Sequence, residues 1–153
     1  MIQKTIIANY GDPDLGKTTS VKLVCEKLKA IADEEQELYT PAQLNGDICY
    51  ILTINGVKVG ISSQGDPWSA QKSLLDELVG NDCTIIITAC RYMGVTERNV
   101  ESFQPDYRIM WTCNARLYQN LGDKRIAPKS IQNRFNDHWA TEIANLIESW
   151  CYA

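Results

Sequence analysis

Gly11-Asp12-Pro13-Asp14-Leu15-Gly16-Lys17-Thr18 is the stretch that decides the fold, and it matches the pattern G-x-x-x-x-G-K-[ST] in full. The apolar run Thr5–Tyr10 precedes it, and residues 17–37 carry apolar side chains at helical spacing. The sequence therefore predicts a strand, a glycine-bounded loop and a helix in succession. This is the context in which the pattern is informative.

The loop has the composition needed to hold the phosphates of a nucleotide. Gly11 and Gly16 permit backbone conformations that turn successive N–H groups toward an anion, and the following helix adds the positive end of its dipole. Lys17 is expected to reach the β- and γ-phosphates, and the Thr18 hydroxyl to bind Mg²⁺ that bridges the same oxygens. Thr19 is expected to contact the α-phosphate.

Two carboxylates in the loop, Asp12 and Asp14, oppose anion binding unless they point outward. Asp14 can instead hydrogen-bond a turn amide, and Pro13 stiffens the turn between them. The alternative is a glycine turn and a lysine that arose by chance or for helix capping, and the strand-loop-helix context weighs against it. The predicted nucleotide-binding residues are Gly11, Asp12, Pro13, Asp14, Leu15, Gly16, Lys17, Thr18 and Thr19.

At 153 residues with 44% hydrophobic content, the chain has the size of one domain and can bury a core. We therefore predict a single nucleotide-binding domain over residues 1–153. No segment has the length of apolar sequence that spans a bilayer, and the first strand begins almost at Met1. These features predict a soluble cytoplasmic protein with no signal peptide and no membrane partner. The six cysteines include no C-x-x-C pair, which favours reduced, buried thiols over a metal site.

Charge is unevenly distributed along the chain. The formal net charge of −4 argues against nucleic acid as a partner, because that binding mode relies on a basic face. Residues 1–82 carry seven lysines and twelve acidic residues, whereas residues 83–153 hold every arginine. These arginines are available as bidentate phosphate ligands that close over a nucleotide, with solvated surface positions as the alternative for most. They are Arg91, Arg98, Arg108, Arg116, Arg125 and Arg134.

Further strands follow the predicted loop and helix. The apolar runs Ile48–Ile54 and Val57–Ser62 flank Asn55-Gly56, which predicts a tight β-hairpin. Cys83–Cys90 is typical of a parallel strand that is buried on both faces, and Asp106–Cys113 is predicted as the last strand.

Helical spacing predicts helices over Trp68–Leu78 and over residues 137–150, and Thr96 is a candidate cap for a short helix. The acidic run Asp33–Glu37 is expected to be the solvated end of the first helix. Residues 114–136 turn polar and basic, which makes this segment a loop or lid candidate. The four tryptophans are expected to pack in the core or at its edges rather than to form a stacking platform.

Through the Gly11–Thr18 motif and its strand-helix alternation, the chain resembles the P-loop NTPase superfamily, in which this motif is called Walker A. The resemblance implies an α/β fold with three layers, α/β/α, and a mostly parallel central sheet that here includes one β-hairpin. It also implies that a nucleoside triphosphate binds with Mg²⁺ at the carboxyl edge of the strands.

A second motif of that superfamily is an apolar strand that ends in an Asp, which holds Mg²⁺, and it is missing in its plain form. Asp66, just after the predicted strand Val57–Ser62, is the best substitute and can act on the metal or its water. The alternative is that Asp66 and Pro67 form the cap and first turn of the next helix.

The sequence lacks the motif that would specify guanine, and this bears on the choice between ATP and GTP. The hairpin and the Ser62–Gly65 loop also look like the layout of small GTPases, where a glycine in that loop senses the γ-phosphate. The guanine-specifying pattern Asn-Lys-x-Asp is absent, however, and Thr112–Ala115 is a poor substitute. We therefore expect ATP, with Mg²⁺, rather than GTP.

Two classes of function stay open. Arg91 and the basic residues 116–134 are similar to those of nucleotide and small-metabolite kinases, in which arginines clamp phosphates. This predicts a small phosphotransferase or NTPase with Lys17, Asp66 and Arg91 as catalytic residues and a small-molecule phosphate acceptor. The alternative is a non-catalytic or slowly hydrolysing switch or accessory module that acts through a protein partner, with Gln64 orienting an attacking water.

Overall fold

The computed structural model describes residues 2–11, 17–91, 94–114, 119–121, 124–126 and 129–153. Its elements in chain order are β1 (Thr5–Gly11), α1 (Lys17–Lys29), β2 (Glu34–Tyr39), β3 (Cys49–Ile54), β4 (Val57–Ser62), α2 (Gln71–Gly80), β5 (Ile85–Arg91), α3 (Val95–Glu101), β6 (Arg108–Thr112), β7 (Gln119–Leu121), β8 (Lys124–Ile126) and α4 (Lys129–Cys151).

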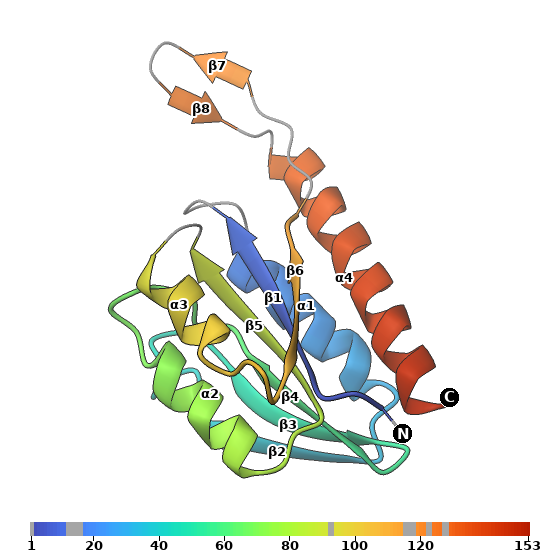
Figure 1. Ribbon diagram of the computed structural model, residues 1–153. Helices are drawn as coiled ribbons and strands as arrows, with labels where there is room; N and C mark the ends of the chain where they lie inside the picture. The colour runs from blue at the N-terminus through green and yellow to red at the C-terminus, as the bar shows by residue number, and fades with distance from the viewer. Residues whose placement is uncertain (1, 12–16, 92–93, 115–118, 122–123, 127–128) are drawn as a thin grey trace.

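A six-stranded sheet, in the order β2-β3-β4-β5-β1-β6, forms the centre of the described structure (Figure 1). Strand β1 pairs in parallel with β5 and with β6, and β5 pairs in parallel with β4. Strand β3 pairs antiparallel with β2 and with β4, and β3 and β4 are the predicted hairpin around Asn55-Gly56. The expected α/β fold with a mostly parallel sheet and one hairpin is therefore present.

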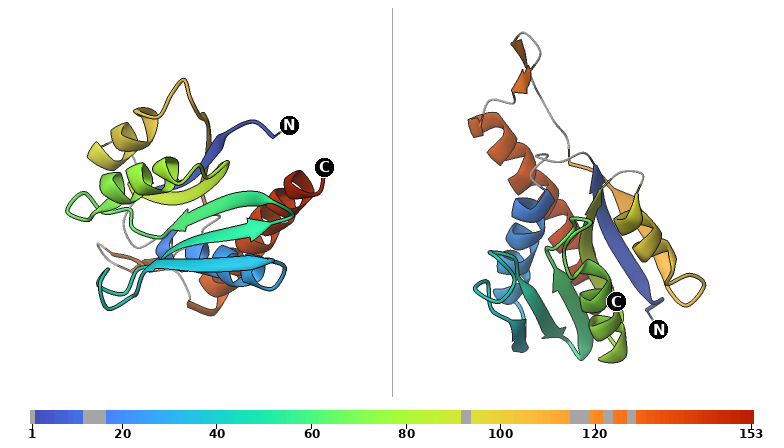
Figure 2. Two further views of the ribbon diagram at one scale, coloured as in Figure 1. Left: turned by 90° about the horizontal axis from the view of Figure 1, so that it is seen from below. Right: turned by 90° about the vertical axis from the view of Figure 1, so that its left-hand side faces the viewer.

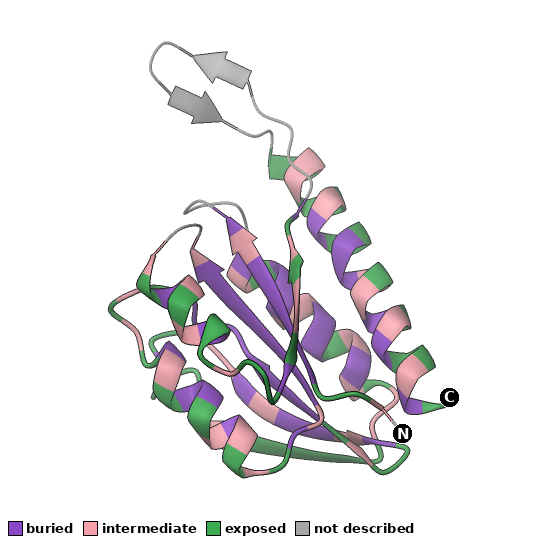
Figure 3. Ribbon diagram, in the orientation of Figure 1, coloured by how far each residue is buried: buried purple, intermediate pink, exposed green. Residues whose placement is uncertain are grey.

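Helices cover both faces of the sheet (Figures 1 and 2). Apolar residues of α1 and α4 share one buried cluster with strand residues such as Ile7 and Ile87, whereas α2 and α3 share another with Ile6 and Ile86. Consecutive residues of β1 and β5 thus face opposite helical layers, which explains why both strands read as continuous apolar runs. Figure 3 shows that burial is concentrated in these central strands.

The acidic run Asp33–Glu37 is not the end of a helix, so that expectation is wrong. Helix α1 stops at Lys29, and Glu34–Tyr39 forms β2 at the edge of the sheet, antiparallel to β3. Glutamate favours helix in isolation, but the open edge of β3 offers a ladder of hydrogen bonds. The Glu side chains of β2 stay exposed there and discourage pairing with another sheet.

Two predicted helix starts are also wrong. Helix α2 begins at Gln71, and Trp68 precedes it with 92% of its surface exposed, rather than packing in the core or at its edge. Thr96 is not a cap, because it lies inside α3, buried, and its hydroxyl accepts a hydrogen bond from the Arg91 N–H at 2.8 Å. For Thr96, the tertiary hydrogen bond with Arg91 overrides the local capping pattern.

The segment predicted as a loop or lid, residues 114–136, is more regular than expected. Strands β7 and β8 pair with each other in a separate two-stranded sheet, so β6 is not the last strand. In Figure 1 this hairpin stands beyond the edge of the main sheet at which β1 ends. Helix α4 begins at Lys129, ahead of the predicted start at residue 137.

The six cysteines are free thiols, and all except Cys113 are buried, as expected for structural residues. Among the described residues, no group of histidine, cysteine and acidic side chains has the arrangement of a metal site. In the same part of the chain, no helix combines the length and apolar character that crossing a bilayer requires.

Alkaline pH should destabilise the fold through these thiols. Burial raises the pKa of Cys25, Cys49 and Cys90 to about 12, from an ordinary value of 9.0. Above 9.0 the unfolded thiols ionise while the folded ones stay protonated, so the free energy of unfolding falls as pH rises toward about 12. Urea unfolding at about pH 8 and about pH 10 measures this fall. A Cys25→Ala variant should show a shallower fall, and an equal fall in both proteins would contradict the assignment.

Candidate functional site

The candidate site lies where β1 ends and α1 begins. Strand β1 ends at Gly11, and α1 begins at Lys17. The parallel register of β1 and β5 places Gly11 opposite Arg91, the last residue of β5. Two predicted site residues that are far apart in the sequence thus meet at one edge of the sheet. The predicted loop residues Asp12, Pro13, Asp14, Leu15 and Gly16 lie outside the described residues.

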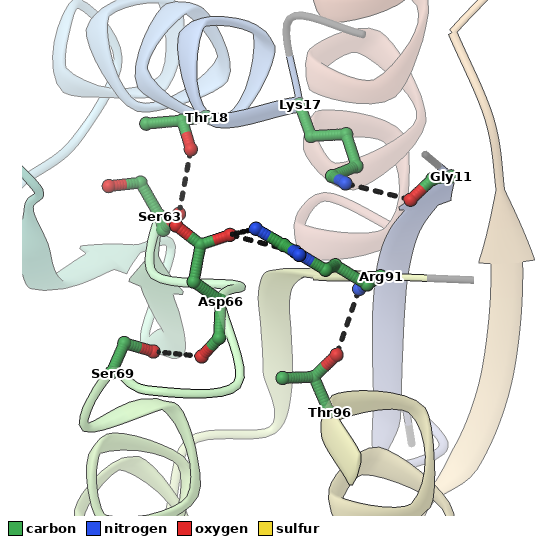
Figure 4. A network of polar contacts seen from close by, with 8 residues as sticks. All are labelled: Gly11, Lys17, Thr18, Ser63, Asp66, Ser69, Arg91 and Thr96. Carbon is green, nitrogen blue, oxygen red and sulfur yellow. Dashed lines mark hydrogen bonds and ion pairs between the residues drawn. The ribbon is translucent and has the colours of Figure 1, made fainter. Parts of the chain in front are cut away.

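Lys17 points back across the start of the loop. Its side chain is mostly buried, with the residue 8% exposed, and Nζ donates a hydrogen bond to the Gly11 carbonyl at 2.8 Å. This contact holds the ammonium group over the edge of β1, as Figure 4 shows. A buried ammonium favours an anionic neighbour, because desolvation strengthens its attraction to negative charge. Lys17 therefore places a positive charge at this edge of the sheet.

Thr18 faces the segment that follows β4. Its hydroxyl donates to the Ser63 carbonyl at 3.3 Å, a long and therefore weak hydrogen bond. Thr19, the next residue, is exposed. Strand β5 separates β4 from β1 in the sheet, so the first turn of α1 bridges this gap and brings β4 into the site.

Asp66 and Arg91 form an ion pair at the same edge. The Arg91 Nε and Nη2 atoms lie 3.1 and 3.0 Å from one carboxylate oxygen, Asp66 Oδ1. The Arg91 side chain is 36% exposed and that of Asp66 66% exposed, so the pair contributes at most about 1 kcal/mol. Figure 4 shows the pair beside Thr18 and Ser63. Because the ion pair is weak, either side chain can readily leave it for a more highly charged partner.

Asp66 is not a helix cap, which excludes the alternative interpretation of this residue. The residue before α2 is Ala70, which makes no side-chain cap hydrogen bond, and the side chain that accepts from the Gln71 N–H is that of Ser69, at 3.3 Å. Residues 66–69 instead form a turn in which the Asp66 carbonyl accepts hydrogen bonds from the Ser69 N–H at 3.1 Å and the Ser69 hydroxyl at 2.6 Å. The carboxylate is thus directed by the turn toward Arg91 rather than toward the helix.

Gln64 has a structural role in this state. It is buried, its side-chain amide donates to the Leu44 carbonyl at 3.1 Å, and its Oε1 accepts from the Ala70 N–H at 2.9 Å. These contacts tie the loop after β2 to the start of α2. The side chain is therefore held away from the role of orienting a water.

Oxygen donors suited to Mg²⁺ meet at this edge. Thr18 offers a hydroxyl, Ser63 a carbonyl and Asp66 a carboxylate, which are hard ligands of the kind that Mg²⁺ prefers. A nucleotide-bound Mg²⁺ needs only one or two protein oxygens, since phosphates and water supply the others. The donor set fits such an ion, provided that the Asp66 carboxylate separates from Arg91.

A buried amide cluster supports the site from behind, and sequence reasoning missed it. Asn114, just after β6, accepts from Asn9 Nδ2 at 2.8 Å, and its own Nδ2 donates to Ser20 and to Asn136. The cluster joins β1, α1, β6 and α4. In the described part of the chain, Asn9 Oδ1 is buried without a hydrogen-bond partner. The available signal was a polar residue at the end of each of two apolar runs, Asn9 and Asn114.

Comparisons of the chain with protein-family models, with curated proteins and with solved structures found no match.

Gly65 is expected to be essential for the geometry of the site. A Cβ atom at this position would lie 2.7 Å from the Ala89 carbonyl carbon and 2.8 Å from its oxygen, both in the backbone of β5. We therefore expect Gly65→Ala to cost about 1–3 kcal/mol of stability and to displace Asp66 from Arg91.

Gly80→Ala is the matched control. Gly80 ends α2 and has open space where a Cβ would stand, so its substitution should be neutral or stabilising by up to about 1 kcal/mol. Chemical denaturation of both variants measures the difference, and equal stabilities would contradict the close packing of Gly65 on Ala89.

Proposed function

We propose that the chain is a P-loop protein that binds ATP with Mg²⁺ and transfers its γ-phosphoryl group to a small acceptor or to water. The observation that carries the proposal is the meeting of Lys17 and Thr18, the last two residues of the G-x-x-x-x-G-K-[ST] motif, with Asp66 and Arg91 at one edge of the sheet. The three-layer arrangement with β1 between two parallel neighbours supports it, since ligands of such sheets bind at the carboxyl ends of the strands.

Each of these residues has a resting partner that a nucleotide can replace. Lys17 would leave the Gly11 carbonyl for the β- and γ-phosphates, because an anion is a stronger partner for an ammonium group than a carbonyl dipole is. Thr18 would leave the Ser63 carbonyl for Mg²⁺, which neutralises charge on the phosphates when bound. Arg91 would leave Asp66 for the γ-phosphoryl group.

Release of Arg91 also frees the Asp66 carboxylate. Asp66 can then act on the metal's water or accept the proton of an attacking hydroxyl. The new bond joins the attacking oxygen to the γ-phosphorus, the bond to the β,γ-bridging oxygen breaks, and ADP leaves. Positioning and charge stabilisation, rather than covalent chemistry of the protein, supply most of the rate in such a transfer.

ATP is favoured over GTP by the position of Asn114. Its side chain is buried in the amide cluster with Asn9, Ser20 and Asn136, so it does not present an amide to a base. This supports the expectation, drawn from the absent Asn-Lys-x-Asp pattern, that guanine is not specifically recognised.

A second candidate is a slowly hydrolysing or non-catalytic module that acts through a protein partner. Two observations favour it: the Gln64 side chain is engaged by Leu44 and Ala70, and Asp66 is engaged by Arg91. A chain that keeps these contacts when ATP binds would hold the nucleotide without activating water.

Lys17→Ala tests the phosphate site directly. We expect it to weaken ATP-Mg²⁺ binding by at least about tenfold, or about 1.4 kcal/mol, because an ammonium group positioned for the β- and γ-phosphates is lost. Titration calorimetry measures the affinity, and thermal unfolding checks that the fold persists. The matched control is Lys22→Ala, on the same helix and only partly buried, which should bind ATP as the unmodified chain does. Normal binding by Lys17→Ala would refute the site.

Release of ADP separates the two candidate functions. The chain is incubated with ATP or GTP and Mg²⁺ across a panel of nucleosides, nucleoside monophosphates and hydroxylated metabolites. Acceptor-dependent ADP release establishes a phosphotransferase, and we expect Asp66→Asn to lower its rate by about a hundredfold or more while ATP still binds. Asp76→Asn removes an exposed carboxylate that pairs with Lys72 and should leave the rate unchanged. Binding without release for every acceptor would instead favour the partner-dependent module.

A further inference from the structure

A cleft opens at the edge of the sheet where β1 ends, on the side of β3 and β4. Its walls include Leu44, Asn45 and Asp47 from the loop after β2, and Gln64, Asp66 and Trp68 from the loop after β4. Its cavity volume of about 360 Å³ is near the lower end of the range for small-molecule sites. Asp66 belongs both to this cleft and to the group formed with Arg91, so the cleft adjoins the proposed phosphate site.

The cleft is preformed by hydrogen bonds between its two walls. The Gln64 side chain connects Leu44 with Ala70. The Ser63 hydroxyl donates to Asp47 Oδ1 at 2.7 Å and accepts from the Ile48 N–H at 2.9 Å. Because both walls are held in place before any ligand arrives, a ligand would lose little affinity to ordering the protein.

Trp68 provides a flat apolar surface at the rim of the cleft. Its side chain is almost fully exposed, although burial of a tryptophan removes more apolar surface from water than burial of almost any other side chain does. A single exposed apolar residue is ordinary by itself. Here it lies on a cleft that also has the apolar side chains of Leu44 and Ala70 and several polar groups, which is the composition of a site for a small planar molecule.

The charge of the cleft restricts which planar molecules fit. Asp47 and Asp66 supply two carboxylates, and among the described residues that line it there is no lysine or arginine. Arg91 offsets the charge of Asp66 in part, whereas the Asp47 carboxylate accepts its hydrogen bond from the neutral Ser63 hydroxyl. Such a cleft disfavours a ligand that carries its own phosphate.

We propose that this cleft is the acceptor site and that the acceptor is an uncharged, hydroxyl-bearing heteroaromatic compound of the nucleoside class, not a nucleoside monophosphate. The assignment rests on the proposed phosphotransferase function. The base stacks on Trp68 and donates hydrogen bonds toward Asp47, and a hydroxyl group reaches Asp66. In the step itself that hydroxyl oxygen bonds to the γ-phosphorus, ADP leaves with the electron pair of the broken bond, and the proton passes to Asp66.

Binding without ATP tests the acceptor site separately from the chemistry. The chain is titrated calorimetrically with adenosine, guanosine, cytidine and thymidine, each beside its 5′-monophosphate. At least one nucleoside should bind more tightly than its monophosphate. Trp68→Ala should weaken that binding about tenfold or more, as loss of a stacking partner does, and leave ATP-Mg²⁺ affinity unchanged. Tyr152→Ala is the matched control, since Tyr152 is an exposed aromatic residue just beyond the end of α4.

Asp47→Asn tests the role of charge. The amide keeps an oxygen that can accept from Ser63 but removes the negative charge, so the preference for nucleoside over monophosphate should shrink by about threefold or more. Tighter binding of every monophosphate to the unmodified chain, or no effect of Trp68→Ala, would overturn the inference. ATP binding with no nucleoside binding would also overturn it and leave the proposed function standing. Nucleoside binding with no ATP binding would overturn the proposed function and, with it, the acceptor role.

Discussion

The parallel pairing of β1 with β5 is the constraint on which the candidate site depends. Both strands are buried between two close-packed helical layers, so a shift of one residue in their register would move each side chain into the opposite layer and disrupt the packing of both. This register is the one that sets Gly11 opposite Arg91. The energy of core packing thus fixes the relative positions of two polar groups that themselves contribute little to stability.

The polar contacts of the site differ in strength according to their burial. The amide cluster around Asn114 is buried, and each lost hydrogen bond there would leave a polar group in an apolar environment at a cost of about 1–3 kcal/mol. The Asp66–Arg91 pair and the Thr18–Ser63 hydrogen bond are exposed or long, and their net contributions are small. A rigid support beneath weak surface contacts suits the proposed site, in which those contacts would give way to a charged ligand.

The cleft beside Trp68 adds a second surface to the same edge. Strand β3 pairs antiparallel with both β2 and β4, so β2 and β4 run in the same direction. The loops that follow these two strands therefore emerge at the same edge of the sheet, where β1 also ends. Gln64 holds these loops together, and its buried position makes it a structural residue rather than a catalytic candidate. The acidic cleft and the lysine at the start of α1 present opposite charges, which suits two ligands of different charge.

The sequence by itself determined the local features of this protein. The motif at residues 11–18, the alternation of apolar runs and helical spacing, and the Asn55-Gly56 turn depend on neighbouring residues, and they predicted β1, α1, the hairpin and β5. Tertiary structure decided the rest. The glutamate-rich run became β2 because the edge of β3 was open for pairing. The Thr96 hydroxyl accepts a hydrogen bond from the Arg91 N–H instead of capping a helix. The pairing of Asp66 with Arg91 and the exposure of Trp68 depend on how distant segments pack, and local propensity carries no information about such contacts.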